Sequence, residues 1–442
     1  MPELTTSVAV LTVIIWSYLT LARGSFWGTK NDKPAANEKA GFPGSAVAVV
    51  PARNEAELIG PVVTSLLNQS VAMPVILVDD GSTDGTTDVA RHAAEKAGKA
   101  DALIVIPGKP LPAGWTGKLW SMHQGIERAG AWNPQWLLLV DADVVHGRQT
   151  VANLGLIASH GPYNLVSYMV KLHCESLPER LLIPAFVYFF FMLYPPAWIR
   201  DSRRSTAGAA GGCMLVRAET LDRAGGLESI RGAVIDDCSL ARLLKQHGGR
   251  LWLGLTDQSQ SLRRYQTFSH IEHMISRTAF NQLKHSSLLL LCTVAGMVIT
   301  YLAPPLLLLT RSRLTIFMGA MAWAAMTMTY STIVRHYRLN PAWALTLPLA
   351  ALFYLGATIH SALNYWTGRG GEWKGRFQDI PDPHTTETPL LYIGPVLRAD
   401  WAGNATRFLS ESCRKLGPAR SPKAPHSILV AFARKHSAYG CK

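Results

Sequence analysis

The chain has 442 residues, of which 17% are charged and 48% hydrophobic, and its formal net charge at pH 7 is +13. Soluble proteins average about 25% charged residues, so this chain is poor in charge and yet basic. The composition excludes an intrinsically disordered protein, which needs low hydrophobicity, and argues against a nucleic-acid binder, whose positive charge is dense. It favours an enzyme that carries apolar membrane segments.

The N-terminus begins with a long uncharged run, Leu4–Ala22, which is long enough to cross a bilayer. Positive residues follow it from Arg23 onward, so the positive-inside rule places the N-terminus outside and the next domain in the cytoplasm. Because a basic segment before the run is missing, we expect an uncleaved anchor at 1–23 rather than a signal peptide. Residues 24–44, rich in Gly, Pro, Asn and Lys, are typical of a linker.

Residues 45–285 alternate short apolar runs with helical patterns, which predicts an α/β domain with a doubly wound, mainly parallel sheet. Strands are predicted at Ala46–Val50, Val75–Val78, Leu103–Ile106 and Trp136–Val140. Helices are predicted at Ala56–Gln69, Thr86–Ala97 and Lys118–Ala129. The strand runs are continuous rather than alternating, as in strands buried on both faces.

Another apolar run, Leu181–Trp198, lies inside this domain and is rich in aromatic residues. Aromatic side chains prefer the headgroup level of a bilayer, so we expect an interfacial helix or a lipid-facing loop. A buried core helix is the alternative.

Residues 286–364 form a predicted membrane region with three uncharged runs: Leu288–Leu309, Leu314–Val334 and Ala342–Leu363. Pro304 and Pro305 interrupt the first run, which predicts a kinked or re-entrant segment. The last residues, 365–442, are a basic polar tail. Four full spans would place this tail outside, against the positive-inside rule, so we expect two to three true helices here.

Polar clusters follow three of the predicted strands, where open α/β sheets bind their ligands. They contain Pro51, Arg53, Asn54 and Glu55; then Asp79 and Asp80; then Asp141 and Asp143. Helix capping explains the nearby Asp84 but not the adjacent pair of aspartates before it. Carboxylates held as close as Asp141 and Asp143 repel each other without a cation, and they suit Mg²⁺ or Mn²⁺ shared with phosphates.

Two later features complete the set. Asp236 and Asp237 open a helical pattern after Gly211 and Gly212; the pair fits a general base, or simply the acidic first turn that a helix dipole favours. Lys118 opens another helix, where a cation beside a helix N-terminus suits a phosphate.

The order of these motifs resembles the family 2 glycosyltransferases, which have the A-type nucleotide-sugar fold, over residues 46–285. The resemblance implies that the first two clusters and Lys118 bind the nucleotide-sugar, with Asp79 and Asp80 on the base and ribose. It further implies that Asp141 and Asp143 hold the metal and diphosphate. Asp237 would be the base and Asp236 its support, while Gly211, Gly212 and Arg277 would lie on the acceptor side.

Within that family the chain most resembles the bacterial hopene-associated glycosyltransferases, through the stretch Pro110–Lys118, the anchor, the C-terminal runs and Trp373–Arg376. Processive members carry Trp after the equivalent of Arg277, and this chain does not, so we expect non-processive transfer. The resemblance implies a UDP-linked donor, a hopanoid or related lipid acceptor, inversion, and a catalytic domain on the cytoplasmic side of the inner membrane. A polyprenyl-phosphate glycosyltransferase and an inactive membrane scaffold are the alternatives.

Overall fold

The computed structural model describes residues 2–28, 42–367, 372–373 and 376–377, all within one structural unit, Met1–Ile380. Most of the predicted linker and almost all of the predicted basic tail lie outside these residues. The expectations for both segments therefore stay predictions.

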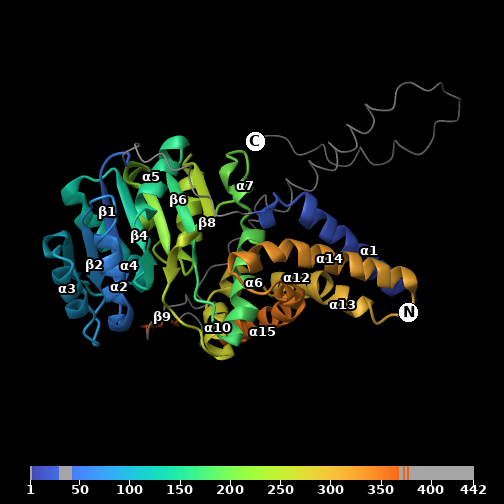
Figure 1. The fold of residues 1–442 in the computed structure, drawn as a ribbon. Helices are drawn as coiled ribbons and strands as arrows, with labels where there is room; N and C mark the ends of the chain where they lie inside the picture. Colours follow the sequence, from blue (N-terminus) through green and yellow to red (C-terminus); the bar gives the residue numbers. More distant parts are fainter. Residues whose placement is uncertain (1, 29–41, 368–371, 374–375, 378–442) are drawn as a thin grey trace, which may run out of the picture. The chain divides into compact units, whose positions relative to one another are not determined.

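An eight-stranded sheet forms the frame of the catalytic part, in the order β3-β2-β1-β4-β7-β6-β8-β5 (Figure 1). Its strands are β1 (Ala46–Ala52), β2 (Val75–Asp79), β3 (Leu103–Pro107), β4 (Trp136–Val140), β5 (Val144–His146), β6 (Leu165–Lys171), β7 (Cys213–Arg217) and β8 (Leu251–Ser261). β1 is parallel to β2 and β4, β2 to β3, and β6 to β8, whereas β7 and β5 run antiparallel to their neighbours. The predicted mainly parallel α/β fold and its four predicted strands are confirmed.

Helices cover both faces of the sheet because successive strand residues point to opposite sides. In β1, Ala48 and Val50 pack with α2 (Ala56–Leu67), α3 (Thr86–Lys96) and α5 (Thr150–His160). Val47 and Val49 face the other layer. That layer contains α4 (Gly117–Ala129), α6 (Leu177–Leu193) and α9 (Asp236–Gln246).

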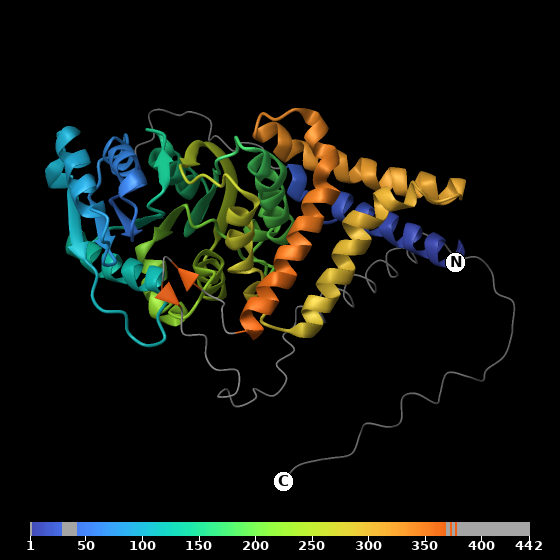
Figure 2. The ribbon, with the colours of Figure 1, turned by 90° about the horizontal axis from the view of Figure 1, so that it is seen from below.

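The hydrophobic core of this second layer also includes side chains of the apolar helices. Its core includes Trp16 of α1 (Pro2–Leu21), Tyr330 of α14 (Arg313–His336) and Tyr354 of α15 (Leu347–Trp366). Figures 1 and 2 both show α1 lying beside α14. The sheet and these helices therefore share one hydrophobic core.

The remaining elements are short or connect these parts. They are α7 (Pro196–Arg200), α8 (Ala218–Arg223), α10 (Phe268–Ser276), α11 (Ala279–Gln282), α12 (Ser287–Met297), α13 (Ala303–Leu307), β9 (Glu372–Trp373), β10 (Arg376–Phe377) and six short helical turns, η1 (Phe26–Gly28), η2 (Ala100–Ala102), η3 (Gly130–Trp132), η4 (Leu227–Ile230), η5 (Val298–Leu302) and η6 (Pro341–Thr346).

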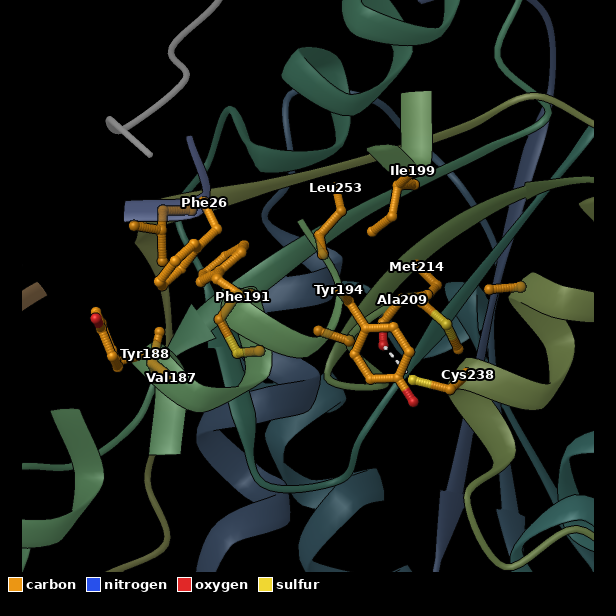
Figure 3. Packing of buried hydrophobic residues seen from close by; sticks show 14 of the residues in the cluster. Phe26, Val187, Tyr188, Phe191, Tyr194, Ile199, Ala209, Met214, Cys238 and Leu253 are labelled. Carbon is orange, nitrogen blue, oxygen red and sulfur yellow. Dashed lines mark hydrogen bonds between the residues drawn. The ribbon is translucent and has the colours of Figure 1, made fainter. Parts of the chain in front are cut away.

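The apolar run Leu181–Trp198 is largely buried in the hydrophobic core. Most of it is α6, whose Tyr188 and Phe191 are fully buried and lie near Phe26 (Figure 3). The Tyr188 hydroxyl is 2.8 Å from Thr329 Oγ1 of α14. The structure therefore favours the core-helix alternative, because α6 fills the space between the sheet and the apolar helices.

Four segments of the described chain are long and apolar enough to cross a membrane: Glu3–Leu21, Leu177–Arg200, Ser287–Leu307 and Pro341–Trp366. They indicate membrane association. The second predicted C-terminal run became α14, which is long but contains five Thr or Ser residues between Thr315 and Thr332 and is not among the four.

The two prolines distort their helix in a specific way. Just before them, η5 is a π-helical turn in which the Ala303 N–H donates to the Val298 carbonyl. The carbonyls of Ile299 and Thr300 then have no backbone donor, because proline has no N–H. Helix α1 supplies the missing donors: Thr12 Oγ1 lies 3.2 Å from the Ile299 carbonyl, and Trp16 Nε1 lies 2.8 Å from the Thr300 carbonyl.

Replacing the indole donor of Trp16 should destabilise the protein. In a Trp16→Phe variant a smaller aromatic ring replaces the indole and the buried Thr300 carbonyl loses its partner, which alone costs about 1–3 kcal/mol of unfolding free energy, with lost packing in addition. Thermal unfolding of the full chain in detergent measures the change. Tyr18→Phe, at an exposed position of α1, is the matched control and should unfold like the wild type. If Trp16→Phe unfolded at the same temperature as the wild type, the hydrogen bond to the Thr300 carbonyl would contribute nothing to stability.

Candidate active site

A cavity of about 400 Å³ lies where β1 and β4 end. Of the residues predicted from the sequence, it is lined by Pro51, Arg53, Glu55, Lys118, Asp141, Asp143, Asp236 and Arg277. Parallel strands bring their carboxyl ends to one edge of the sheet, which is why motifs far apart in the sequence meet here. Asn54, Asp79, Asp80, Gly211, Gly212 and Asp237 do not line the cavity.

Lys118 joins two of the acidic clusters. It lies in the first turn of α4, and its Nζ is 2.8 Å from Asp141 Oδ1, just after β4, and 3.0 Å from Asp236 Oδ2, at the start of α9. Burial opposes the charge of this lysine, but the two carboxylates outweigh burial and hold the pKa of Lys118 above its usual value. The cation therefore stays charged and neutralises part of the cavity.

Arg263 joins the other two acidic residues of the cavity, Asp143 and Glu55. It was not predicted from the sequence. Its Nε lies 2.8 Å from Asp143 Oδ2 and its Nη2 lies 2.6 Å from Glu55 Oε1. Burial again opposes the charge, and Asp143 and Glu55 raise the pKa of Arg263 despite it. The only sequence signal was its place just after the long strand β8, where another strand end meets the site.

Asp141 and Asp143 fit a hard divalent cation. Each keeps one oxygen that no described residue engages, because Lys118 uses Oδ1 of Asp141, while Arg263 and Ser261 use Oδ2 of Asp143. Within the described ranges no group of three or more His, Cys, Asp or Glu is placed to hold a metal. Mg²⁺ commonly takes one or two carboxylates and fills its remaining positions with phosphate oxygens and water, so this donor set suffices.

Asp237 lies behind Asp236 and is held by the backbone. Its Oδ2 accepts a hydrogen bond of 2.9 Å from Gly211 N, and its Oδ1 accepts one of 2.6 Å from Cys238 N. Burial and the neighbouring Asp236 raise the pKa of Asp237 to about 6, although Lys118 and the two N–H donors oppose the shift. Gly211 thus positions the carboxylate.

Gly212 has a packing role instead. A Cβ at this position would meet Val170 Cγ2 at 3.0 Å, so any larger residue would require a shift of the Val170 side chain.

Asn54 of the first motif and Asp79 of the second do not line the cavity but hold the surrounding loops in place. Asn54 has a left-handed backbone (φ 50°), and its Oδ1 accepts from Thr83 N at 3.0 Å while its own N–H donates to Ser82 Oγ at 2.9 Å. Asp79 Oδ1 accepts from Ser82 N at 3.1 Å. These bonds tie the loop after β1 to the loop after β2.

A similar pairing fixes the arginine of the first motif. Asp80 is buried, and its carboxylate lies 3.7 Å from Arg53 Nη1, which also donates to the Asp80 carbonyl. Arg53 is thereby aimed along the cavity wall, and Asp80 acts on the site through it.

The wall opposite the strand ends comes from the loop after β8 and from α10. Tyr265 lies in this loop, and its N–H donates to Glu179 Oε1 at 2.7 Å. Glu179 is fully buried at the start of α6, where it also closes a capping box with Ser176. This carboxylate, missed by the sequence analysis, fixes the loop that carries Arg263 to the buried helix.

Comparisons with known proteins agree with this geometry. A family model described as "Glycosyltransferase like family 2" matches residues 43–262. Two 4,4'-diaponeurosporenoate glycosyltransferases from strains of Staphylococcus aureus are 36% identical over 105 residues and 37% identical over 101 residues. Those matches cover 24% and 23% of this chain and 25% and 24% of the relatives, so the chain spans about a quarter of their length.

Two solved structures are also similar. A mannosyltransferase from Pyrobaculum calidifontis in complex with GDP-Man and Mn²⁺ is 16% identical, with a TM-score of 0.46, covering 81% of this chain and 99% of that one. TarS from S. aureus in complex with UDP-GlcNAc is 14% identical, with a TM-score of 0.33, covering 76% and 97%. By the family match, together with the acidic strand-end site, residues 43–262 of this chain form a family 2 glycosyltransferase domain.

Proposed function

We propose that this enzyme transfers a sugar from a nucleotide-sugar to a hydroxyl of a hopanoid or related isoprenoid lipid. The resemblance to the family favours a UDP-linked donor. One observation carries the proposal: Asp141, Asp143, Lys118 and Asp236 meet in one cavity of a domain that shares its core with helices apolar enough for a membrane. The relatives named for an isoprenoid acid support an isoprenoid acceptor. The domain would face the cytoplasm, where nucleotide-sugars are made.

The donor diphosphate belongs beside Lys118 and Arg263. Both cations are already in the cavity and paired with carboxylates. When the diphosphate binds, its oxygens replace carboxylate oxygens as the hydrogen-bond acceptors of these two cations. A Mg²⁺ or Mn²⁺ ion held by Asp141 and Asp143 would supply positive charge at the leaving group. Arg53 and Glu55 line the nucleotide side of the cavity.

Asp237 is proposed as the base and Asp236 as its support. Lys118 pairs with Asp236 at 3.0 Å, whereas Asp237 has no cation of the described residues this close and its raised pKa suits a base near neutral pH. Because Asp237 lies behind Asp236 and outside the cavity lining, the acceptor hydroxyl has to reach past Asp236 to give its proton to Asp237. The hydroxyl oxygen then bonds to the anomeric carbon as the bond from that carbon to the diphosphate oxygen breaks. A single displacement of this kind inverts the configuration at that carbon.

Removing the base should stop transfer without removing the donor. Asp237→Asn keeps an oxygen that accepts from Gly211 or Cys238 but has no useful basicity, so turnover should fall by at least about 100-fold. Donor affinity, measured by titrating UDP-sugars onto the full chain in detergent, should persist. Asp222→Asn, an exposed substitution on α8, is the matched control. Full turnover in Asp237→Asn together with loss in Asp236→Asn would transfer the role to Asp236.

Turnover should also depend on pH in a defined direction. With its pKa raised to about 6, Asp237 is protonated below that pH and cannot accept the hydroxyl proton. The rate of transfer at saturating substrate should therefore fall as the pH is lowered through about 6 and level off above it. A rate that is flat from pH 5 to 8 would exclude this carboxylate as the base.

Removing the metal should separate function from folding. Lys118 and Arg263 already neutralise the acidic residues, so chelation with EDTA should leave the thermal unfolding temperature unchanged. Transfer should be lost and should return when Mn²⁺ or Mg²⁺ is added. Undiminished transfer in EDTA would show that the two cationic side chains suffice.

A further inference from the structure

Helix α10 separates the cavity from the apolar helices. One side of it, with Ile271 and Ile275, is buried in the shared core. The other side presents His270, His273 and Met274 to the cavity, and Arg277 continues that row just after the helix ends. The spacing of three and four residues places these four side chains on one flank.

This helix is fixed to α15, within one of the four segments apolar enough for a membrane. The Phe268 and Phe353 rings lie 5.8 Å apart, and Ser361 Oγ donates to the Ser276 carbonyl. The same Ser361 oxygen accepts from Phe280 N at 3.0 Å. Helix α10 therefore lies between the cavity, which one of its flanks lines, and the apolar helix α15.

The cationic side chains of the cavity differ in whether a carboxylate lies beside them. Lys118 and Arg263 each lie between two carboxylates, and Arg53 pairs with Asp80. Arg277 is exposed, and no carboxylate of the described residues lies within ion-pair distance of it. His273 has only Glu272 of its own helix, at 3.9 Å, and that glutamate also pairs with His360.

Given the proposed transfer to a lipid, we propose that Arg277, with His270 and His273, binds an acidic group of the acceptor, a carboxylate or a phosphate. Two other cations of the cavity, Lys118 and Arg263, are already paired with four carboxylates (Glu55, Asp141, Asp143, Asp236) and are assigned to the donor diphosphate, which leaves the flank of α10 for the acceptor. The guanidinium matches the oxygens of either group through two parallel N–H donors. The acceptor is thus an amphiphile with an isoprenoid body and an anionic end, which α10 orients.

Direct lipid binding tests this without any sugar transfer. Geranylgeraniol, geranylgeranoic acid and geranylgeranyl phosphate share one chain and differ at the end, and each can be titrated onto the full-length protein in detergent by tryptophan fluorescence. We expect the acid or the phosphate to bind at least about tenfold more tightly than the alcohol. Arg277→Gln should remove this preference and leave binding of the alcohol unchanged.

Two controls make the outcome decisive. Arg264→Gln removes an exposed arginine of the neighbouring loop that does not line the cavity, and should keep the preference. UDP and GDP binding to Arg277→Gln should match the wild type. Equal binding of the three lipids, or a loss of nucleotide affinity in Arg277→Gln without a change in lipid binding, overturns the proposal. Since nucleotide binding is measured separately, failure here leaves the proposed glycosyltransfer standing, and failure of donor binding counts against that function instead.

Discussion

The site depends on two cations that lie among four carboxylates. Without Lys118 and Arg263, the acidic residues at the ends of β1 and β4 and at the start of α9 would repel one another at close range. Each cation joins acids from two different segments, so the electrostatic pairing also fixes the geometry of the cavity. The site is therefore assembled before any ligand arrives, which lowers the cost of ordering it during catalysis.

The frame that brings these groups together is a sheet whose two faces have different neighbours. One face is covered by α2, α3 and α5 in the usual manner of an α/β domain, whereas the other shares its core with α6 and with the apolar helices. Glu179 connects the two regions most directly, since it lies at the start of α6 and accepts a hydrogen bond from Tyr265 in the loop that carries Arg263. This buried carboxylate thus links α6 directly to a loop that lines the catalytic cavity.

Much of this arrangement follows from sequence patterns alone. The strands β1 to β4 were predictable because each is a short apolar run followed by a turn, and the site residues were predictable because strand ends converge at one edge. Arg263 and Glu179 were not predictable, since their importance comes from partners 208 and 86 residues away along the chain. The burial of Leu181–Trp198 was not predictable because an aromatic run looks alike whether lipid or another helix covers it. Asn54 and Asp80 hold the loops after β1 and β2 in place, and their expected contacts with the nucleotide stay a prediction.

The hydrogen bonds from Thr12 and Trp16 to the carbonyls left open by Pro304 and Pro305 have a consequence for how the protein must be made. The first helix to be synthesised completes the backbone pairing of a segment that follows nearly three hundred residues later, so neither can reach its final state alone. During synthesis, Thr12 and Trp16 therefore have no access to these carbonyl acceptors until residues 299–300 have been made. The N-terminal helix α1 and the segment before Pro304 therefore contact each other directly, while the catalytic domain lies between them in the sequence.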